Sequence, residues 1–228
     1  YNPHNHCNQR IAPDSTFKVP LSLMAFDQNI INQDSVFTWD GKKRELPDWN
    51  QNQTPATWLK YSVLWVSQVL TPQLGYARIQ QYLVGFDYGN QDFRGDPGKH
   101  NGLTRAWISS SLKISALEQL HFLNAMLSHE LPVSENAVEN TQKNMYLGKL
   151  ANGADYYGKT GSGQNASAAN PRHLRDGWFI GFIESGQTRY VFVSNLTDKN
   201  TPAPLDKSYG SGILKPITLK FLNEYFAL

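Results

Sequence analysis

The feature that most constrains the fold is a change in hydrophobic periodicity near Tyr156. Before this residue, apolar side chains gather in stretches dense enough for buried helices, separated by turns that contain proline or glycine. After it, short aromatic and β-branched runs are bordered by glycine, as is typical of strands. Helices in the middle, strands late in the chain and a final helix predict an α+β protein in which helices flank an antiparallel sheet.

Local signals place the expected elements. Thr54-Pro55 and Thr71-Pro72 each indicate an N-cap followed by proline at the first helical position, and Ser115 with Glu118 indicates a capping box. Ser185-Gly186-Gln187 is typical of a tight connection between two strands. We therefore expect helices over residues 19–26, 55–69, 74–85 and 115–127, strands over 156–162, 177–184 and 188–196, and a final helix that opens at Pro216.

Composition limits the possible classes of protein. The 228 residues are 40% hydrophobic and 12% aromatic, enough for one large domain or two lobes that share a cleft. The net charge is +2 and the basic residues are scattered, so nothing indicates a nucleic-acid partner. No apolar run is long enough to cross a bilayer, and no signal peptide precedes Tyr1. His4, His6 and the single cysteine, Cys7, lack a matching second ligand pair, so we expect no disulfide and no metal site.

Ser15-Thr16-Phe17-Lys18 is the candidate catalytic motif. At a helix start, residues three apart lie about one turn from each other on the same face, so the Lys18 amine can reach the Ser15 hydroxyl. An alcohol is a poor nucleophile at neutral pH and needs such an adjacent base. The free backbone N–H groups of a helix start would also stabilise an oxyanion formed beside Ser15. The same short pattern occurs by chance in ordinary amphipathic helices, so it carries weight only in context.

Further motifs follow in a fixed order. Ser62-Val63-Leu64 comes first, then Tyr88-Gly89-Asn90, then a Trp107-Ile108 pair, and finally Lys159-Thr160-Gly161. S-x-x-K with a later K-T-G is the signature of serine β-lactamases and penicillin-binding proteins. The full combination resembles the class D β-lactamases, the oxacillinases. This resemblance implies a single two-lobed domain over residues 1–228, with an antiparallel sheet, a helical lobe and an active site in the cleft between them.

The resemblance also implies roles for individual residues. Ser15 would attack the lactam carbonyl, and Lys18 would be the base, N-carboxylated by dissolved carbon dioxide without any other cofactor. Burial lowers the pKa of a lysine, and only the neutral amine reacts with carbon dioxide. Ser62 and Lys159 would relay a proton to the lactam nitrogen, and the backbone N–H groups of Ser15 and Ser162 would form an oxyanion hole. The predicted substrate-binding residues are Leu64, Trp107 and Ile108, expected around the lysine, and Thr160, Gly161 and Ser162. The Thr160 and Ser162 hydroxyls, with the Lys159 ammonium, would hold the substrate carboxylate.

Several positions depart from the family pattern. Leu64 replaces a common valine, and its extra methylene would narrow the path of carbon dioxide or water to Lys18. Leu214 stands where many relatives have an arginine that grips the substrate carboxylate, with Lys215 next to it. Asp14, just before the nucleophile, is expected to act as a helix N-cap. The sequence lacks most of the family's N-terminal strand region, so we expect fewer strands in the sheet.

The resemblance favours one function and leaves an alternative open. The favoured function is hydrolysis of penicillins and oxacillin-type β-lactams through a serine acyl-enzyme, in a bacterial periplasm. The alternative is the β-lactam sensor domain of a membrane receptor, which keeps its acyl group as a signal. A penicillin-binding transpeptidase is a third, weaker interpretation. In each case the expected partner is a small-molecule β-lactam, and the protein is expected to be a monomer or weak dimer.

Overall fold

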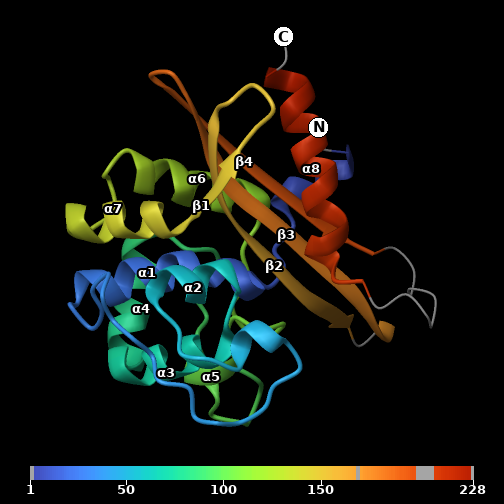
Figure 1. Cartoon of the computed structure of the whole chain (residues 1–228). Coiled ribbons are helices and arrows are strands. Elements are labelled where there is room, and N and C mark those ends of the chain that lie inside the picture. The colour runs from blue at the N-terminus through green and yellow to red at the C-terminus, as the bar shows by residue number, and fades with distance from the viewer. Residues whose placement is uncertain (1–2, 168–169, 199–207, 227–228) are drawn as a thin grey trace.

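A four-stranded antiparallel sheet in the order β1-β2-β3-β4 forms the centre of the molecule. The computed structural model describes residues 3–167, 170–198 and 208–226. Helices pack on both faces of the sheet, which confirms the predicted α+β class (Figure 1). The strands are β1 (Tyr146–Lys149), β2 (Asp155–Ser167), β3 (Asn170–Ser185) and β4 (Thr188–Thr197).

The helices fall into two groups. The C-terminal helix α8 (Gly210–Phe226), red in Figure 1, packs on one face against β2, β3 and β4. The remaining helices form a lobe on the other side of the sheet. They are α1 (Lys18–Asp27), α2 (Pro55–Lys60), α3 (Leu64–Leu74), α4 (Tyr76–Gly85), α5 (Gly102–Arg105), α6 (Ala116–Leu127) and α7 (Glu135–Asn144), with short 3₁₀ turns η1 (Pro3–Asn8), η2 (Asp14–Phe17) and η3 (Pro47–Trp49).

Side-chain alternation along the strands separates two hydrophobic cores. Trp178, Ile180 and Phe182 of β3 belong to the large core of the helical lobe. Ile183 lies in a smaller core with Leu222 of α8. Successive side chains of a strand point to opposite faces, so β2, β3 and β4 contribute to both cores. This arrangement leaves the helical lobe and α8 on either side of the strand that carries the K-T-G motif.

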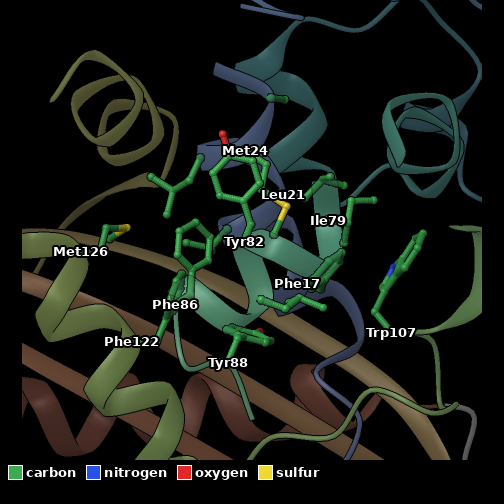
Figure 2. Close-up of a cluster of buried hydrophobic side chains, with 14 of the residues drawn as sticks. Phe17, Leu21, Met24, Ile79, Tyr82, Phe86, Tyr88, Trp107, Phe122 and Met126 are labelled. Atoms are coloured by element: carbon green, nitrogen blue, oxygen red, sulfur yellow. The ribbon is translucent and has the colours of Figure 1, made fainter. Parts of the chain in front are cut away.

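Aromatic side chains anchor the chain segment that carries Ser15. Phe17, fully buried, stacks on Trp107 with ring centroids 5.3 Å apart and meets the edge of Tyr88 at 6.1 Å (Figure 2). Trp107 in turn stacks on Phe93 at 5.9 Å. Aromatic contacts of this kind add to the area that each ring buries. The η2 turn therefore enters α1 with its position fixed by the core of the lobe.

Three local signals in the sequence are confirmed. Thr54 caps α2, with Pro55 at the first helical position and Thr57 completing a capping box. Ser115 and Glu118 form the predicted capping box at the start of α6. β3 and β4 pair from Ser185 and Thr188 onward, as the predicted tight connection requires.

The single helix expected over residues 55–69 is instead two helices. Helix α2 ends at Lys60 and α3 begins at Leu64, and Ser62 between them has a φ of +59°. Hydrogen bonds span the break, because Val63 N donates to Trp58 O at 3.0 Å. Apolar side chains of both helices are buried, so the apolar pattern of the sequence continues across residues 61–63 and does not indicate the break. The prediction was wrong here because a left-handed serine is stabilised by tertiary contacts.

The prediction of an N-cap at Thr71-Pro72 was wrong. Pro72 lies inside α3, and Thr71 Oγ1 donates to Ser67 O, one turn earlier, at 3.0 Å. The next helix begins at Tyr76, after Gly75 with a φ of +79°. The threonine hydroxyl therefore contacts the carbonyl oxygens of Ser67 and of Leu103 in α5 instead of capping a helix, and Gly75 makes the turn.

The prediction that Pro216 opens the last helix was also wrong. Pro216 lies inside α8, which begins at Gly210. A Cβ on Gly210 would lie 2.4 Å from the Asp176 carbonyl oxygen, so the helix start packs backbone to backbone on β3. This contact between distant segments sets the helix start. Helix α7 and the short strand β1 were not predicted, because the former is mostly polar and the latter has four residues.

Tyr88-Gly89-Asn90 holds the segment that follows Trp107. Asn90 Oδ1 accepts from Lys113 N at 2.8 Å, and Asn90 Nδ2 donates to Ser111 O at 2.9 Å. Gly89 has a φ of +59°, and a Cβ there would lie 2.1 Å from Lys113 O. The motif thus joins two loops through backbone contacts that only glycine permits.

We expect Gly89→Ala to destabilise the protein by about 2–4 kcal/mol, from the positive φ and the overpacking together. Gly41→Ala is the matched control, because Gly41 has a φ of +76° and open space around its Cβ position. The control should cost only about 1 kcal/mol. Urea unfolding of the two variants measures the difference, and equal losses would contradict the close contact at Gly89.

Candidate active site

The Ser15 hydroxyl and the Lys18 amine meet as the sequence predicts. Ser15 lies in η2, and Lys18 is the first residue of α1. Lys18 Nζ is 3.2 Å from Ser15 Oγ. Ser15 is partly exposed, whereas Lys18 is completely buried. The pair therefore joins an accessible nucleophile to a base shielded from water.

Burial sets the protonation of Lys18. Removal from water lowers the pKa of its amine to about 7, although the neighbouring Asp14 carboxyl opposes this effect. A lysine with this pKa is partly neutral at physiological pH. Lys18 is thus able to take a proton from Ser15 without a histidine.

Ser62 and Lys159 form a second polar pair. Lys159 Nζ donates to Ser62 Oγ at 2.9 Å and to Thr160 O at 2.9 Å. Burial lowers the pKa of Lys159, and the ammonium groups of Lys18 and Lys215 lower it further. The break between α2 and α3 is what turns Ser62 towards this lysine. The two motifs, far apart in sequence, are joined by this contact.

The edge of β2 that carries the K-T-G motif is open. Gly158 N donates to Met145 O and Gln164 N to Ser109 Oγ, both on the side away from β3. Backbone groups of an antiparallel strand alternate between its two edges. The N–H of Ser162 and the C=O of Thr160 therefore also point away from β3. An N–H donor without a strand partner thus lies at the cleft.

Close packing brings this strand against the nucleophile turn. A Cβ on Gly161 would lie 2.9 Å from Pro13 O, and one on Gly163 would lie 2.2 Å from an Asp14 carboxylate oxygen. Larger side chains at either position would push β2 away from η2. Gly161, predicted as a binding residue, therefore acts by permitting the approach of the two backbones.

Asp14 is not the helix cap that we predicted. Pro13 occupies the N-cap position without a side-chain cap, and the Asp14 Oδ1 atom instead accepts from Ser109 N at 3.0 Å and Ser109 Oγ at 3.2 Å. Asp14 has a φ of +47°, which turns its side chain away from the turn. Its Oδ2 atom is buried without a hydrogen-bond partner. Burial raises the pKa of Asp14 to about 7, despite the Ser109 hydrogen bonds.

A cavity of about 330 Å³ is lined by five of the ten predicted site residues. Ser15 and Ser62 line it from the helical lobe. The other lining residues are Thr160, Gly161 and Ser162 of β2, Glu45, Leu46 and Trp49 near η3, and Tyr209, Ser211 and Gly212 at the start of α8. Sequence reasoning missed the last two groups, because no motif marks them and only the fold brings them to the cavity.

The remaining predicted residues lie away from the cavity wall. Trp107 is fully buried, and Leu64 and Ile108 are half-buried against the same core that holds Phe17. The Trp107 indole N–H has no acceptor among the described residues. A wider hollow of about 900 Å³ beside α5 holds none of the predicted catalytic residues.

Polar groups of α8 occupy the region of the missing arginine. Leu214 is buried, whereas the Lys215 ammonium lies 5.6 Å from the centre of the Phe179 ring. Burial lowers the pKa of Lys215. Ser211 N donates to Ser162 Oγ at 3.0 Å, and the two hydroxyls are 2.7 Å apart. The two hydroxyls therefore lie at this end of the cleft, and the Lys215 ammonium lies on the same helix as Ser211, against Phe179.

Comparisons with known proteins agree with this geometry. The model of the penicillin-binding protein transpeptidase domain matches residues 1–223. β-Lactamase OXA-1 of Escherichia coli is 53% identical over 193 residues, which are 84% of this chain and 68% of that protein. The crystal structure of the class D β-lactamase OXA-427 superposes with a TM-score of 0.88 at 37% identity, over 97% of this chain and 91% of that one.

The chain belongs to the class D β-lactamases. The class D β-lactamase from Bacillus subtilis also superposes, with a TM-score of 0.81 at 31% identity, over 98% of this chain and 84% of that chain. The methicillin resistance mecR1 protein of Staphylococcus aureus is 34% identical over 92% of this chain, but the match spans only 34% of that longer protein. In the described part of this family member, no helix has both the length and the apolar character needed to cross a bilayer.

The raised pKa of Asp14 predicts a pH-dependent stability. A carboxyl that binds its proton more tightly when folded stabilises the fold below its unfolded pKa of about 3.9, and this contribution is lost as the pH rises through about 7. Relative to Asp14→Asn, the wild-type free energy of unfolding should therefore fall between pH 4 and pH 8, by on the order of 4 kcal/mol at most. Urea unfolding of both proteins at each pH measures this, and parallel curves would exclude the shift.

Proposed function

We propose that this protein hydrolyses β-lactam antibiotics, penicillins of the oxacillin type among them, through an acyl-enzyme on Ser15. The observation that carries the proposal is the contact between Ser15 Oγ and the buried Lys18 amine, 3.2 Å apart at the edge of the cavity. The pKa of about 7 for the Lys18 amine suits a general base at neutral pH. Family membership supports the same activity, since OXA-1 and OXA-427 are named β-lactamases.

Acylation uses the two polar pairs in turn. The N-carboxylated Lys18 proposed for this site would take the proton of Ser15 as Oγ bonds to the lactam carbonyl carbon. The N–H groups of Ser15 and Ser162 stabilise the resulting oxyanion, because the first lies at the start of η2 and the second on the open edge of β2. The C–N bond then breaks, and the lactam nitrogen takes a proton that Ser62 delivers and Lys159 supplies.

Deacylation requires a base for water, and we propose an N-carboxylated Lys18 for this step. The residues present fit such a group. The lysine amine is buried with a pKa of about 7, so a neutral fraction can react with carbon dioxide. The Trp107 indole N–H, without an acceptor among the described residues, is a donor for an added carboxylate. The added carboxylate would offer the attacking water a charge-assisted hydrogen bond, which a neutral amine does not.

Lys159 and Lys215 provide the charge that recognises the substrate carboxylate. They lie close enough for the Lys215 ammonium to lower the pKa of Lys159. Thr160, Ser162 and Ser211 line the cavity itself with hydroxyl groups. An anion between these groups would relieve the repulsion of the two ammonium ions. We therefore propose that Lys215 takes the part of the arginine that Leu214 replaces.

Family membership also supports the proposed setting. We propose that the protein acts in a bacterial periplasm, as a monomer or weak dimer, on a small-molecule β-lactam and without a metal ion. The sensor interpretation differs in one respect that can be measured, since a sensor would retain its acyl group. The similarity to the mecR1 protein, at 34% identity, is the reason to test the sensor interpretation as well.

Intact-protein mass spectrometry after mixing with benzylpenicillin tests the proposed reaction. A mass increase equal to one benzylpenicillin should appear and then clear, and added bicarbonate should speed its clearance. Lys18→Ala should acylate slowly and deacylate at least about 100-fold more slowly, because it lacks the general base. Ser15→Ala should form no adduct. A wild-type adduct that persists would favour the sensor, and no adduct would contradict both interpretations.

Lys215→Gln tests the proposed carboxylate site. Loss of this half-buried ammonium should raise the KM for benzylpenicillin by about threefold to tenfold and change kcat less. Lys220→Gln is the matched control, since this exposed lysine on the same helix pairs only weakly with Glu224, at 3.8 Å. Steady-state kinetics at low ionic strength make the measurement. An equal effect of the two variants would contradict a specific role for Lys215.

A further inference from the structure

The mouth of the cleft carries an acidic group that the proposed reaction does not use. Glu45 lines the same cavity as Ser15, and its side chain is exposed, so its carboxylate lies at the rim. Within the described ranges, Glu45 makes no ion pair and no side-chain hydrogen bond. The nearby Asp40, in contrast, is engaged by Arg44 at 2.8 Å. Glu45 is therefore a carboxylate available to a ligand.

Two aromatic side chains line the cavity together with Glu45. Trp49 is held in place, because its Nε1 donates to Tyr61 O at 2.9 Å and its carbonyl oxygen accepts from Trp65 Nε1 at 3.0 Å. Tyr209, 56% exposed, belongs to the same wall. A carboxylate beside aromatic rings is a suitable environment for an organic ammonium group. The rim is therefore suited to a ligand whose ammonium group is attached to an apolar group.

The charges of the cleft have opposite signs at different places. Lys159 and Lys215 gather on the side of β2 and α8, whereas Glu45 enters from the loop that precedes α2. In a penicillin, the carboxylate and the acyl side chain are attached at opposite ends of the fused rings. A substrate whose carboxylate meets the lysines therefore extends its acyl side chain away from them. An amine in that side chain would be complementary to Glu45.

We propose that Glu45 makes this enzyme favour β-lactams whose acyl side chain carries a protonated amine over matched substrates without one. The inference rests on the proposed β-lactam hydrolysis, and it adds a specificity-determining residue to it. Glu45 takes no part in bond making. It acts by attracting and orienting the charged side chain in the enzyme–substrate complex and in the transition state.

Ampicillin and benzylpenicillin form the matched substrate pair, because they differ only in an α-amino group. The ratio of their kcat/KM values is measured at pH 6.5, below the usual pKa of an α-amino group, about 7.7–8.0. In Glu45→Gln, the ratio of ampicillin to benzylpenicillin should fall about twofold to fivefold, the range for an exposed ion pair. In the wild type, about 0.5 M sodium chloride should lower the same ratio, because salt screens exposed charges.

Asp48→Asn is the control variant. It removes a negative charge from the same loop at an exposed residue that does not line the cavity, so the ratio should stay unchanged. Hydrolysis of both substrates with the same ratio in wild type and Glu45→Gln would overturn the role of Glu45 alone. An equal fall in Asp48→Asn would overturn it too, since the effect would then belong to the loop's overall charge. No hydrolysis of either substrate by the wild type would overturn the proposed function together with this inference.

Discussion

The burial of the Lys18 amine is the constraint on which the site depends. An ammonium ion without water around it is costly, and the lysine responds with a pKa of about 7. The aromatic core around Phe17 and Trp107 creates this environment at the start of α1. The same packing that stabilises the helical lobe therefore leaves a partly neutral amine beside Ser15. Stability and chemistry are coupled here, because the core cannot loosen without returning water to the lysine.

A second constraint is the close approach of β2 to the nucleophile turn. Gly161 and Gly163 let the strand pass within contact distance of Pro13 and Asp14. This approach carries Lys159 to Ser62 and leaves the N–H of Ser162 at the open edge of the strand. The cleft thus lies at the interface between the sheet and the helical lobe. Its two walls are joined by backbone contacts, which gives the polar groups fixed positions without flexible linkers.

The inner side and the outer rim of the cleft carry charges of opposite sign. On the inner side, burial lowers the pKa of Lys159, and the ammonium groups of Lys18 and Lys215 lower it further. The buried Asp14 carboxyl acts on Lys18, and burial raises its own pKa to about 7. The outer rim instead carries Glu45 among aromatic rings. A bound molecule with charges of both signs would therefore be oriented before any bond is broken.

The sequence by itself determined local features, including the contact between Ser15 and Lys18. Helix caps at Thr54 and Ser115 depend on neighbouring residues, and the Ser15–Lys18 contact depends on one helical turn, so both were predictable. The tertiary structure alone decided the break at Ser62, the true orientation of Asp14 and the start of α8 at Gly210, since each is set by contacts between distant segments. It also decided that Glu45, Trp49 and Ser211 share the cavity with Ser15. Periodicity reports which face of an element is buried, but not which distant backbone or side chain that face will meet.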